Sequence, residues 1–265
     1  MKLDDIGVVV LSHGRKNKLE KSLRSYEENG LTDMVGDNFV FFNSIGPEDV
    51  KLIENDYKKF EYGGHQQNCG IAWGMIKGIT ECNTKYVLFL ENDFELQATA
   101  EDIYLQLEMG YRNIKNGKID VIKYRRLDDY KRTCNETVNW HKKGGRKSVE
   151  HTASKHIGFT VEENFGYDNS DICTLIDCVK GRYLWSMLSK DAGWSNNPFL
   201  CKKEWFLELA YKIGFEEMEH APNDRNPDFE QQLQPDNWHD ENYKIGILPG
   251  LFAHQADGRT FGFYE

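Results

Sequence analysis

The sequence predicts an α/β protein with a central, mostly parallel sheet flanked by helices. Apolar, β-branched runs alternate with segments of helical periodicity through the first 124 residues, an order typical of βα units. The run at 85–90 shows no regular alternation of apolar and polar residues. Both faces of that strand should therefore be covered, as in the centre of such a sheet. Polar turns follow the apolar runs, and ligands of open α/β sheets bind at those strand ends.

The opening of the chain is the clearest βα unit. Residues 6–11 are apolar and mostly β-branched, which predicts a strand, and the turn Ser12-His13-Gly14-Arg15 follows. A helix is expected over 16–29, where apolar side chains recur at i, i+4 and i+7. Gly30 then ends the helix.

The next segments repeat this order. A strand is expected at 38–43, a polar helix at 47–59 and a short strand at 60–62. The glycines at 63 and 64 indicate a flexible loop. A small-residue turn at 68–70 then leads into an amphipathic helix, and the strand at 85–90 follows.

The second half is less regular. We expect helices at 100–113 and 202–213, and strands at 120–124, 182–188 and 244–249. The interval 125–190 begins with a basic, glycine-containing stretch and is interpreted as a variable insertion or a solvated loop. Residues 194–200 indicate an aromatic, amide-rich loop of the kind that contacts sugars.

The composition excludes several classes of protein. With 265 residues and 39 % hydrophobic content, the chain suits a single domain with a substantial core. Its net charge of -10 argues against nucleic acid as a partner. No apolar run approaches the roughly 20 residues of a membrane span.

Cysteine usage and the N-terminus bear on the compartment. The six cysteines show neither Cys-x-x-Cys spacing nor a zinc-ligand pattern. No charged-then-apolar leader precedes the first strand. We therefore expect free thiols and a cytoplasmic location.

Two acids one residue apart follow the central strand. Glu91 and Asp93 should lie side by side where the strand leaves the sheet. Neighbouring carboxylates repel each other unless a cation joins them, and a hard divalent ion that also binds phosphate oxygens suits this arrangement. The alternative is an acidic turn that only caps the strand.

The residues before these acids carry a family resemblance. Asn68-Cys69-Gly70, a helix with small residues and then Glu91-Asn92-Asp93 together resemble the family 2-like glycosyltransferases of the GT-A fold. The spacing from Asn68 to Glu91 matches that family. The chain departs from the pattern at positions 75 and 76, where the family often has Arg-Asn and this chain has methionine and isoleucine.

The resemblance implies a site for a nucleotide-diphosphate sugar and for Mn²⁺ or Mg²⁺. The implied donor-binding residues are Ser12, Arg15, Asn43, Asn68, Gly70, Glu91 and Asn92. The implied metal ligands are Glu91, Asp93 and His254, the last because a late histidine often returns to the metal in such enzymes. An ordinary solvated turn remains the alternative for Ser12 and Arg15.

The resemblance also implies an acceptor side. Asp228, followed by Phe229, matches in part the family's motif that supplies the general base, with Glu230 in reserve and helix capping as the alternative. The acceptor-binding candidates are Trp194, Asn196 and Asn197.

The sequence thus predicts a single GT-A catalytic domain over 1–265, with a nucleotide-sugar half (1–124), the insertion (125–190) and a smaller acceptor-side half (191–265). The expected activity is inverting transfer of a sugar from a UDP- or GDP-sugar to a hydroxyl group of a glycan or glycoconjugate. A sugar-1-phosphate nucleotidyltransferase and a catalytically silent binding relative are the alternatives. The first would need a glycine-rich basic loop after the first strand, where this chain has one glycine.

Overall fold

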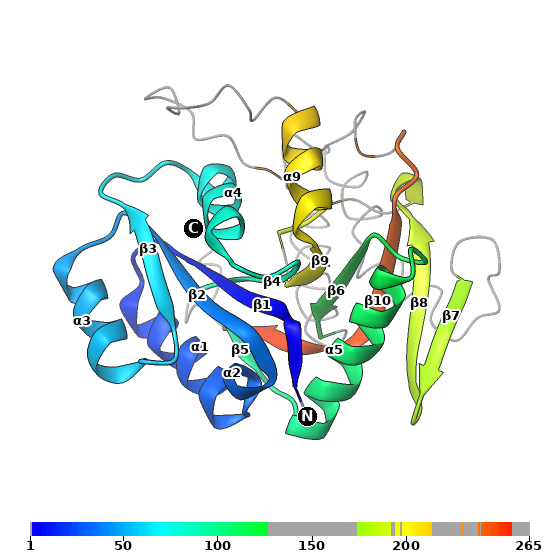
Figure 1. Cartoon of the computed structure of the whole chain (residues 1–265), viewed down its shortest axis with the longest axis horizontal. Helices are drawn as coiled ribbons and strands as arrows, with labels where there is room; N and C mark the ends of the chain where they lie inside the picture. The colour runs from blue at the N-terminus through cyan, green and yellow to red at the C-terminus, as the bar shows by residue number, and fades with distance from the viewer. Residues whose placement is uncertain are drawn as a thin grey trace, which may run out of the picture.

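A computed structural model describes residues 2–126, 174–191, 194–196, 198–213, 229, 238 and 240–255. Within this part of the chain, one ten-stranded sheet has the order β3-β2-β1-β4-β9-β6-β10-β8-β7, and β5 pairs with β10 outside that path. Figure 1 shows the sheet running through the molecule with helices on both sides. The α/β prediction is confirmed.

The first half of the sheet is parallel. It consists of β1 (Leu3–Ser12), β2 (Val35–Asn43), β3 (Glu61–His65) and β4 (Tyr86–Glu91). The connecting helices are α1 (Lys16–Glu28), the short α2 (Leu31–Met34), α3 (Pro47–Asp56) and α4 (Ile71–Glu81). Because these strands are parallel, their carboxyl ends meet at one edge, and the turns that follow them lie together.

The second half is mixed. Antiparallel β9 (Phe199–Lys202) lies between β4 and β6 (Val121–Arg125). Next to β6 comes β10 (Lys244–His254), and the hairpin of β8 (Arg182–Leu188) and β7 (Thr174–Val179) forms the far edge. The remaining elements are β5 (Phe94–Leu96), α5 (Ala100–Lys115), a 3-10 turn at Ser189–Asp191 and α9 (Lys203–Lys212).

Strand alternation divides the core between the two faces of the sheet. In β4, Leu88 and Leu90 pack with residues of α1 and α5, whereas Val87 and Phe89 pack with residues of α4 and α9. All four are fully buried. This explains the missing apolar–polar alternation of the β4 sequence, because neither face meets water.

Several predicted boundaries are wrong. The glycines at 63 and 64 lie inside β3, where a Cβ on Gly64 would come within 2.4 Å of the Phe42 carbonyl oxygen, so the strand requires a glycine there. Residues 199 and 200, expected in a loop, belong to β9, and the last strand continues to His254 instead of ending at 249. In the 125–190 interval, the residues described from 174 onward form the β7–β8 hairpin and the start of the 3-10 turn.

Two general expectations can also be compared with the structure. The described cysteines, Cys69, Cys82, Cys178 and Cys201, are free thiols. Among the described helices, none is both long and apolar enough to cross a membrane.

Truncation in β4 should test the two-sided core. Leu88→Ala removes a fully buried side chain and leaves a cavity, so the free energy of unfolding should fall by about 2–5 kcal/mol. Urea denaturation measures this value. Leu175→Ala is the control: this leucine lies on edge strand β7 and is 47 % exposed, so the change should stay within about 0.5 kcal/mol. Equal losses in the two variants would contradict the assignment of β4 to the core.

Candidate active site

The candidate site lies where the carboxyl ends of β1, β2 and β4 meet the returning end of β10. Asn92 joins two of the turns, because its Nδ2 donates to Ser12 Oγ at 3.2 Å and to the Gly14 carbonyl at 3.1 Å. Its backbone N–H donates to the Leu11 carbonyl at 3.0 Å. The side chains of Ser12 and Asn92 are buried and bonded to each other. Both residues therefore fix the shape of the edge, and their predicted contact with a nucleotide stays untested.

Asn43, at the end of β2, positions the turn before α4. Its Oδ1 accepts from the Cys69 N–H at 2.7 Å, and its Nδ2 donates to the Gly70 carbonyl at 2.9 Å. Asn68 closes the same turn, since its Oδ1 accepts from the Gly70 N–H at 2.9 Å. The predicted donor-binding residues Asn43, Asn68 and Gly70 are thus brought together. Because Asn43 is 2 % exposed, its amide supports backbone here, and base recognition by it stays a prediction.

His13 connects these two turns and was not singled out from the sequence. Its Nδ1 lies 2.5 Å from the Asn43 carbonyl oxygen, and its Nε2 lies 3.2 Å from Asn68 Nδ2. A carbonyl can only accept, so the assigned tautomer carries its proton on Nδ1 and accepts at Nε2. The contact joins separate βα units, so no local sequence pattern predicts it.

Asp93 is the centre of the charged part of the site. Its Oδ2 lies 3.1 Å from His254 Nε2, 3.2 Å from Arg15 Nη1 and 3.7 Å from Lys18 Nζ. The residue is 5 % exposed. Its other oxygen, Oδ1, is buried and has no hydrogen-bond partner within the described residues. A buried carboxylate oxygen without a partner is costly, so Oδ1 is a candidate ligand-binding atom.

The protonation of Asp93 follows from these neighbours. Burial by itself would raise the pKa of the carboxyl group. The hydrogen bond and charge of His254, together with the charges of Lys18 and Arg15, outweigh burial and lower the pKa below its ordinary value. Asp93 is therefore ionised at neutral pH.

Helix α1 holds the backbone around Asp93 through hydroxyl groups on its buried face. Ser22 Oγ donates to the Asn92 carbonyl at 3.0 Å, and Tyr26 OH donates to the Phe94 carbonyl at 2.6 Å. Ser25 Oγ accepts from the Leu96 N–H at 3.0 Å. These bonds satisfy polar backbone groups that the short β5 leaves buried. The acidic turn is thus held in place from the helix side.

The end of β10 holds the same turn from the opposite side. The Gln255 N–H donates to the Asp93 carbonyl at 2.7 Å. The Gln255 side chain donates to Ser22 Oγ at 2.8 Å and to the Lys18 carbonyl at 3.0 Å. His254 is therefore kept beside Asp93 by the residue that follows it.

Two of the three predicted metal ligands, Asp93 and His254, lie close enough together to bind one divalent cation. Asp93 supplies an unpartnered carboxylate oxygen and His254 an imidazole, both suitable for Mn²⁺. Within the described residues, no three His, Cys, Asp or Glu side chains form a group that could hold a metal. Glu91 ends β4 opposite Leu11 and is not gathered with the other two. The sequence-derived trio is thus brought together only in part.

Two cations at the start of α1 extend the site. Arg15 has a left-handed backbone (φ 55°) and a half-exposed side chain, and Lys18 lies in the first turn of the helix. The first turn of α1 contains no acidic residue, although acids are favoured there by the helix dipole. Lys18 was missed from the sequence. A basic first turn directly after a glycine turn was the signal that could have identified it.

The acceptor-side candidates are more deeply placed than expected. Trp194 is 2 % and Asn196 5 % exposed, and the indole N–H donates to Asn196 Oδ1 at 3.1 Å. The Trp194 ring packs against Phe199 and Phe229, and Lys123 Nζ lies 3.8 Å from its centre. In this arrangement both side chains belong to the core, so burial gives no support to their predicted contact with an acceptor. Asn197, Asp228 and Glu230 lie outside the described residues.

Comparison with known proteins identifies the fold. The structure resembles S. aureus TarS, a glycosyltransferase of GT-A type. Its residues 1–349 superpose with a TM-score of 0.51 at 12 % identity, covering 96 % of this chain and 60 % of that one. The crystal structure of TarS gives a TM-score of 0.51 at 12 % identity, with coverages of 98 % and 38 %.

The complex of TarS 1–349 with UDP gives a TM-score of 0.50 at 12 % identity, covering 98 % of this chain and 62 % of that one. The present chain thus spans about three fifths of the shorter TarS form. No protein-family model and no curated protein sequence matches the chain. The predicted GT-A type of fold is therefore confirmed by structure, at a sequence identity that shows the fold alone.

Acid titration should reveal the role of the Asp93 cluster in stability. The pKa of Asp93 in the folded protein is lower than the value of about 3.9 expected in the unfolded chain. The carboxylate thus contributes stability that is fully present above the unfolded value and is lost as pH falls through the folded value. Urea unfolding of the native chain and Asp93→Asn should show a stability difference that shrinks as the pH falls below about 5. A difference independent of pH would contradict this.

Proposed function

We propose that the chain is a metal-dependent glycosyltransferase that moves a sugar from a nucleotide-diphosphate sugar to a hydroxyl group of a glycan. The observation that carries this proposal is Oδ1 of Asp93, which is buried at the carboxyl edge of a GT-A sheet and has no hydrogen-bond partner among the described residues. His254 and two cationic side chains meet the other oxygen of the same carboxylate. The bound UDP of one TarS structure supports a nucleotide as the ligand class.

The charges at the start of α1 suit the diphosphate of such a donor. Arg15 Nη1 and Lys18 Nζ lie 3.2 Å and 3.7 Å from Asp93 Oδ2, so two positive groups adjoin the buried carboxylate. A guanidinium binds phosphate oxygens through paired donors, and an ammonium binds them as a point charge. The N–H groups at the start of a helix add to this attraction.

Asp93 and His254 are the residues that would hold the cation. When bound, a Mn²⁺ or Mg²⁺ ion would neutralise the charge that builds up on the departing nucleoside diphosphate. Phosphate oxygens and water would complete its coordination. The hydrogen-bonded position of His254 against Asp93 means that its Nε2 must give up a proton to become a ligand. Glu91 remains the third candidate from the sequence.

The acceptor hydroxyl needs a base on the side opposite the leaving group. Asp228 is assigned this role, with Glu230 as the second candidate. Their neighbour Phe229 is fully buried and stacks on Phe206 with ring centres 5.0 Å apart. Phe229 also packs on Trp194, so the residue between the two candidate acids belongs to the core beside β9. One base opposite one leaving group gives inversion.

The two alternative functions differ in testable ways. A sugar-1-phosphate nucleotidyltransferase would release pyrophosphate from a nucleoside triphosphate, and a silent relative would bind the nucleotide without turnover. The turn after β1 has a single glycine, Gly14, and its neighbour Ser12 is bonded to Asn92. This turn does not provide the glycine-rich phosphate loop that the first alternative needs.

The donor test uses UDP- and GDP-sugars with and without Mn²⁺. We expect slow release of nucleoside diphosphate from one donor, only with metal, because water can replace the acceptor.

Asp93→Asn should abolish metal-dependent nucleotide binding in calorimetry while the fold survives, because it removes the buried carboxylate. His254→Ala should weaken binding less, since one of several ligands is lost. Unchanged metal-dependent affinity in Asp93→Asn would overturn the metal site. In a parallel assay with a nucleoside triphosphate and a sugar 1-phosphate, release of pyrophosphate would favour the nucleotidyltransferase.

The base is tested by separating binding from transfer. Asp228→Asn should keep the affinity for the nucleotide-sugar and lose about 10²–10⁴ in transfer rate, because only proton removal from the acceptor is affected. Glu230→Gln is the matched control two residues further along the chain. If Glu230→Gln alone is inactive, the base is Glu230. If neither variant slows transfer, or if the product retains the donor's anomeric configuration, the proposed mechanism is wrong.

A further inference from the structure

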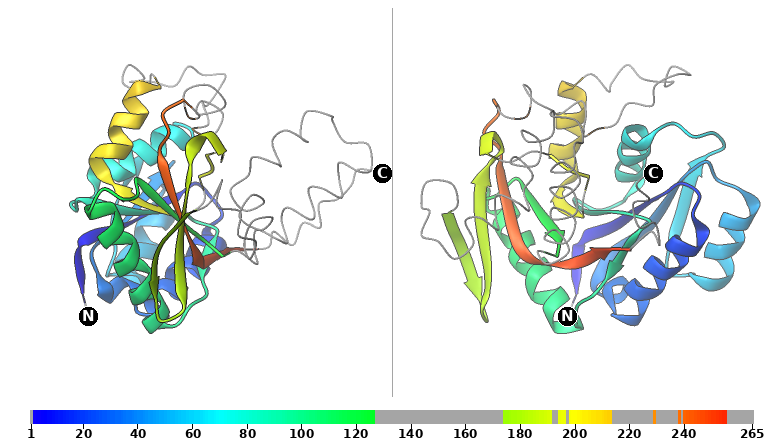
Figure 2. Two further views of the ribbon diagram at one scale, coloured as in Figure 1. Left: turned by 90° about the vertical axis from the view of Figure 1, so that its right-hand side faces the viewer. Right: turned by 180° about the vertical axis from the view of Figure 1, so that it is seen from behind.

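The last strand of the sheet changes partners along its length. Residues 245–247 of β10 pair in parallel with residues 121–123 of β6. The register then shifts: from Ile247 to Phe252, β10 advances five residues while β6 advances two. Beyond the shift, residues 252–254 pair with β5, so that His254 lies opposite Phe94. Figures 1 and 2 show β10 bending away from β8 toward β5 at this point.

Gly250 is the residue at the bend. Its backbone has φ +92°, and a Cβ there would lie 2.4 Å from the Arg125 carbonyl oxygen. A residue with a side chain would therefore clash as well as being strained. The bend also removes the N–H and C=O of Gly250 from the regular ladder, so these polar groups need another partner.

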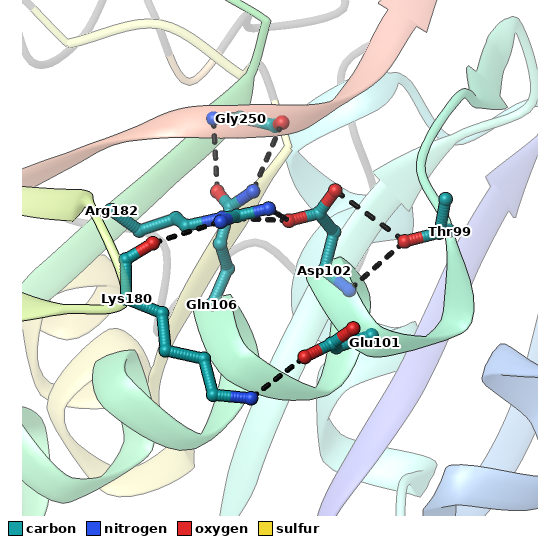
Figure 3. A network of polar contacts seen from close by, with 7 residues as sticks. All are labelled: Thr99, Glu101, Asp102, Gln106, Lys180, Arg182 and Gly250. Atoms are coloured by element: carbon teal, nitrogen blue, oxygen red, sulfur yellow. Dashed lines mark hydrogen bonds and ion pairs between the residues drawn. The ribbon is translucent and has the colours of Figure 1, made fainter.

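Gln106 of α5 supplies that partner. Its Oε1 accepts from the Gly250 N–H at 3.0 Å, and its Nε2 donates to the Gly250 carbonyl at 3.4 Å. The glutamine is 3 % exposed. Figure 3 shows the amide facing both backbone groups of Gly250. One side chain thus replaces the two ladder bonds that the strand loses at the bend.

The first turns of α5 are fixed by a polar network. Thr99 Oγ1 caps the helix by accepting from the Asp102 N–H at 3.3 Å, and the Asp102 carboxylate accepts from Arg182 Nε at 2.8 Å (Figure 3). Lys180 Nζ binds Glu101 at 2.7 Å. These contacts attach α5 to the β7–β8 hairpin, whose β8 pairs with the straight part of β10. Gln106 is therefore anchored to the half of the strand that precedes the bend.

We propose that Gln106 is a positioning residue that sets the bend of β10 at Gly250 and thereby holds His254 against Asp93. Gln106 need not contact the site directly, since the strand itself transmits the placement. The placement of His254 by Gln106 is independent of any activity, whereas its consequence for catalysis rests on the proposed function.

Amide hydrogen exchange of Gln106→Met tests the proposal, because methionine keeps the length of the side chain and loses both hydrogen bonds. Beyond the bend, the amides of Gln255 and Gln97 donate to Asp93 and Leu251. We expect their exchange to accelerate about tenfold or more relative to the native chain. Before the bend, the amides of Asp120 and Ser189 donate to Lys244 and Tyr243. Their exchange should change much less.

Asn113→Leu is the matched control. Asn113 is also a buried amide of α5, but it bonds Met109 and Asp177 instead of β10. This variant should lose stability without the selective acceleration at Gln255. The milder Gln106→Glu keeps an acceptor for the Gly250 N–H and should give a smaller effect than Gln106→Met. Equal acceleration on both sides of the bend, or none, in both Gln106 variants would overturn the proposal.

Binding of Mn²⁺ alone, measured by calorimetry, gives the functional readout. If His254 is a ligand, its misplacement in Gln106→Met should weaken Mn²⁺ binding about tenfold or more, and Asn113→Leu should not. Selective exchange at Gln255 with unchanged Mn²⁺ affinity would leave the positioning role intact and would count against His254 as a ligand in the proposed function. The two failures are therefore distinguishable.

Discussion

The structure depends on one junction, where the end of β10 meets the acidic turn after β4. At this junction the backbone of Gln255 donates to Asp93, and the side chain of Gln255 reaches Ser22 of α1. The contact joins the last described strand to the first βα unit, more than 230 residues away in sequence. The burial and the lowered pKa of Asp93 follow from this junction, because the end of β10 packs over the acidic turn and places the imidazole of His254 beside the carboxylate. The acidic turn is thus held in place by the residues at the end of β10.

The charges of the junction are distributed unevenly over the two oxygens of the Asp93 carboxylate. Arg15 and Lys18 stand in the first turn of α1, where the helix dipole disfavours cations. Asp93 compensates them through one oxygen, and its other oxygen is buried without a partner among the residues that the structure describes. Such an unsatisfied buried oxygen costs free energy. This imbalance makes the turn a better candidate for a site than a simple strand cap, which was the alternative from the sequence.

The sequence predicts the elements whose patterns are local. The strand of β1, the two-sided β4 and the helix α5 were expected, because periodicity and flanking polar residues define them. The strand β9 was missed because Phe199 and Leu200 become a strand only by pairing with β4 and β6. The continuation of β10 was missed because Pro249 and Gly250 usually end a strand. Here they make a bend, and its partner Gln106 comes from a distant helix.

The same distinction separates the site residues that the sequence could assign from those it could not. A motif shows that Asn43, Asn92 and Asp93 stand at strand ends, but not what their side chains face. The two asparagines turn out to bond backbone and neighbouring turns, which makes them supports of the edge. Only for Asp93 do side chains from α1 and β10 converge on one carboxylate. Because this convergence is a tertiary property, the motif could point to Asp93 but could not show which side chains surround its carboxylate.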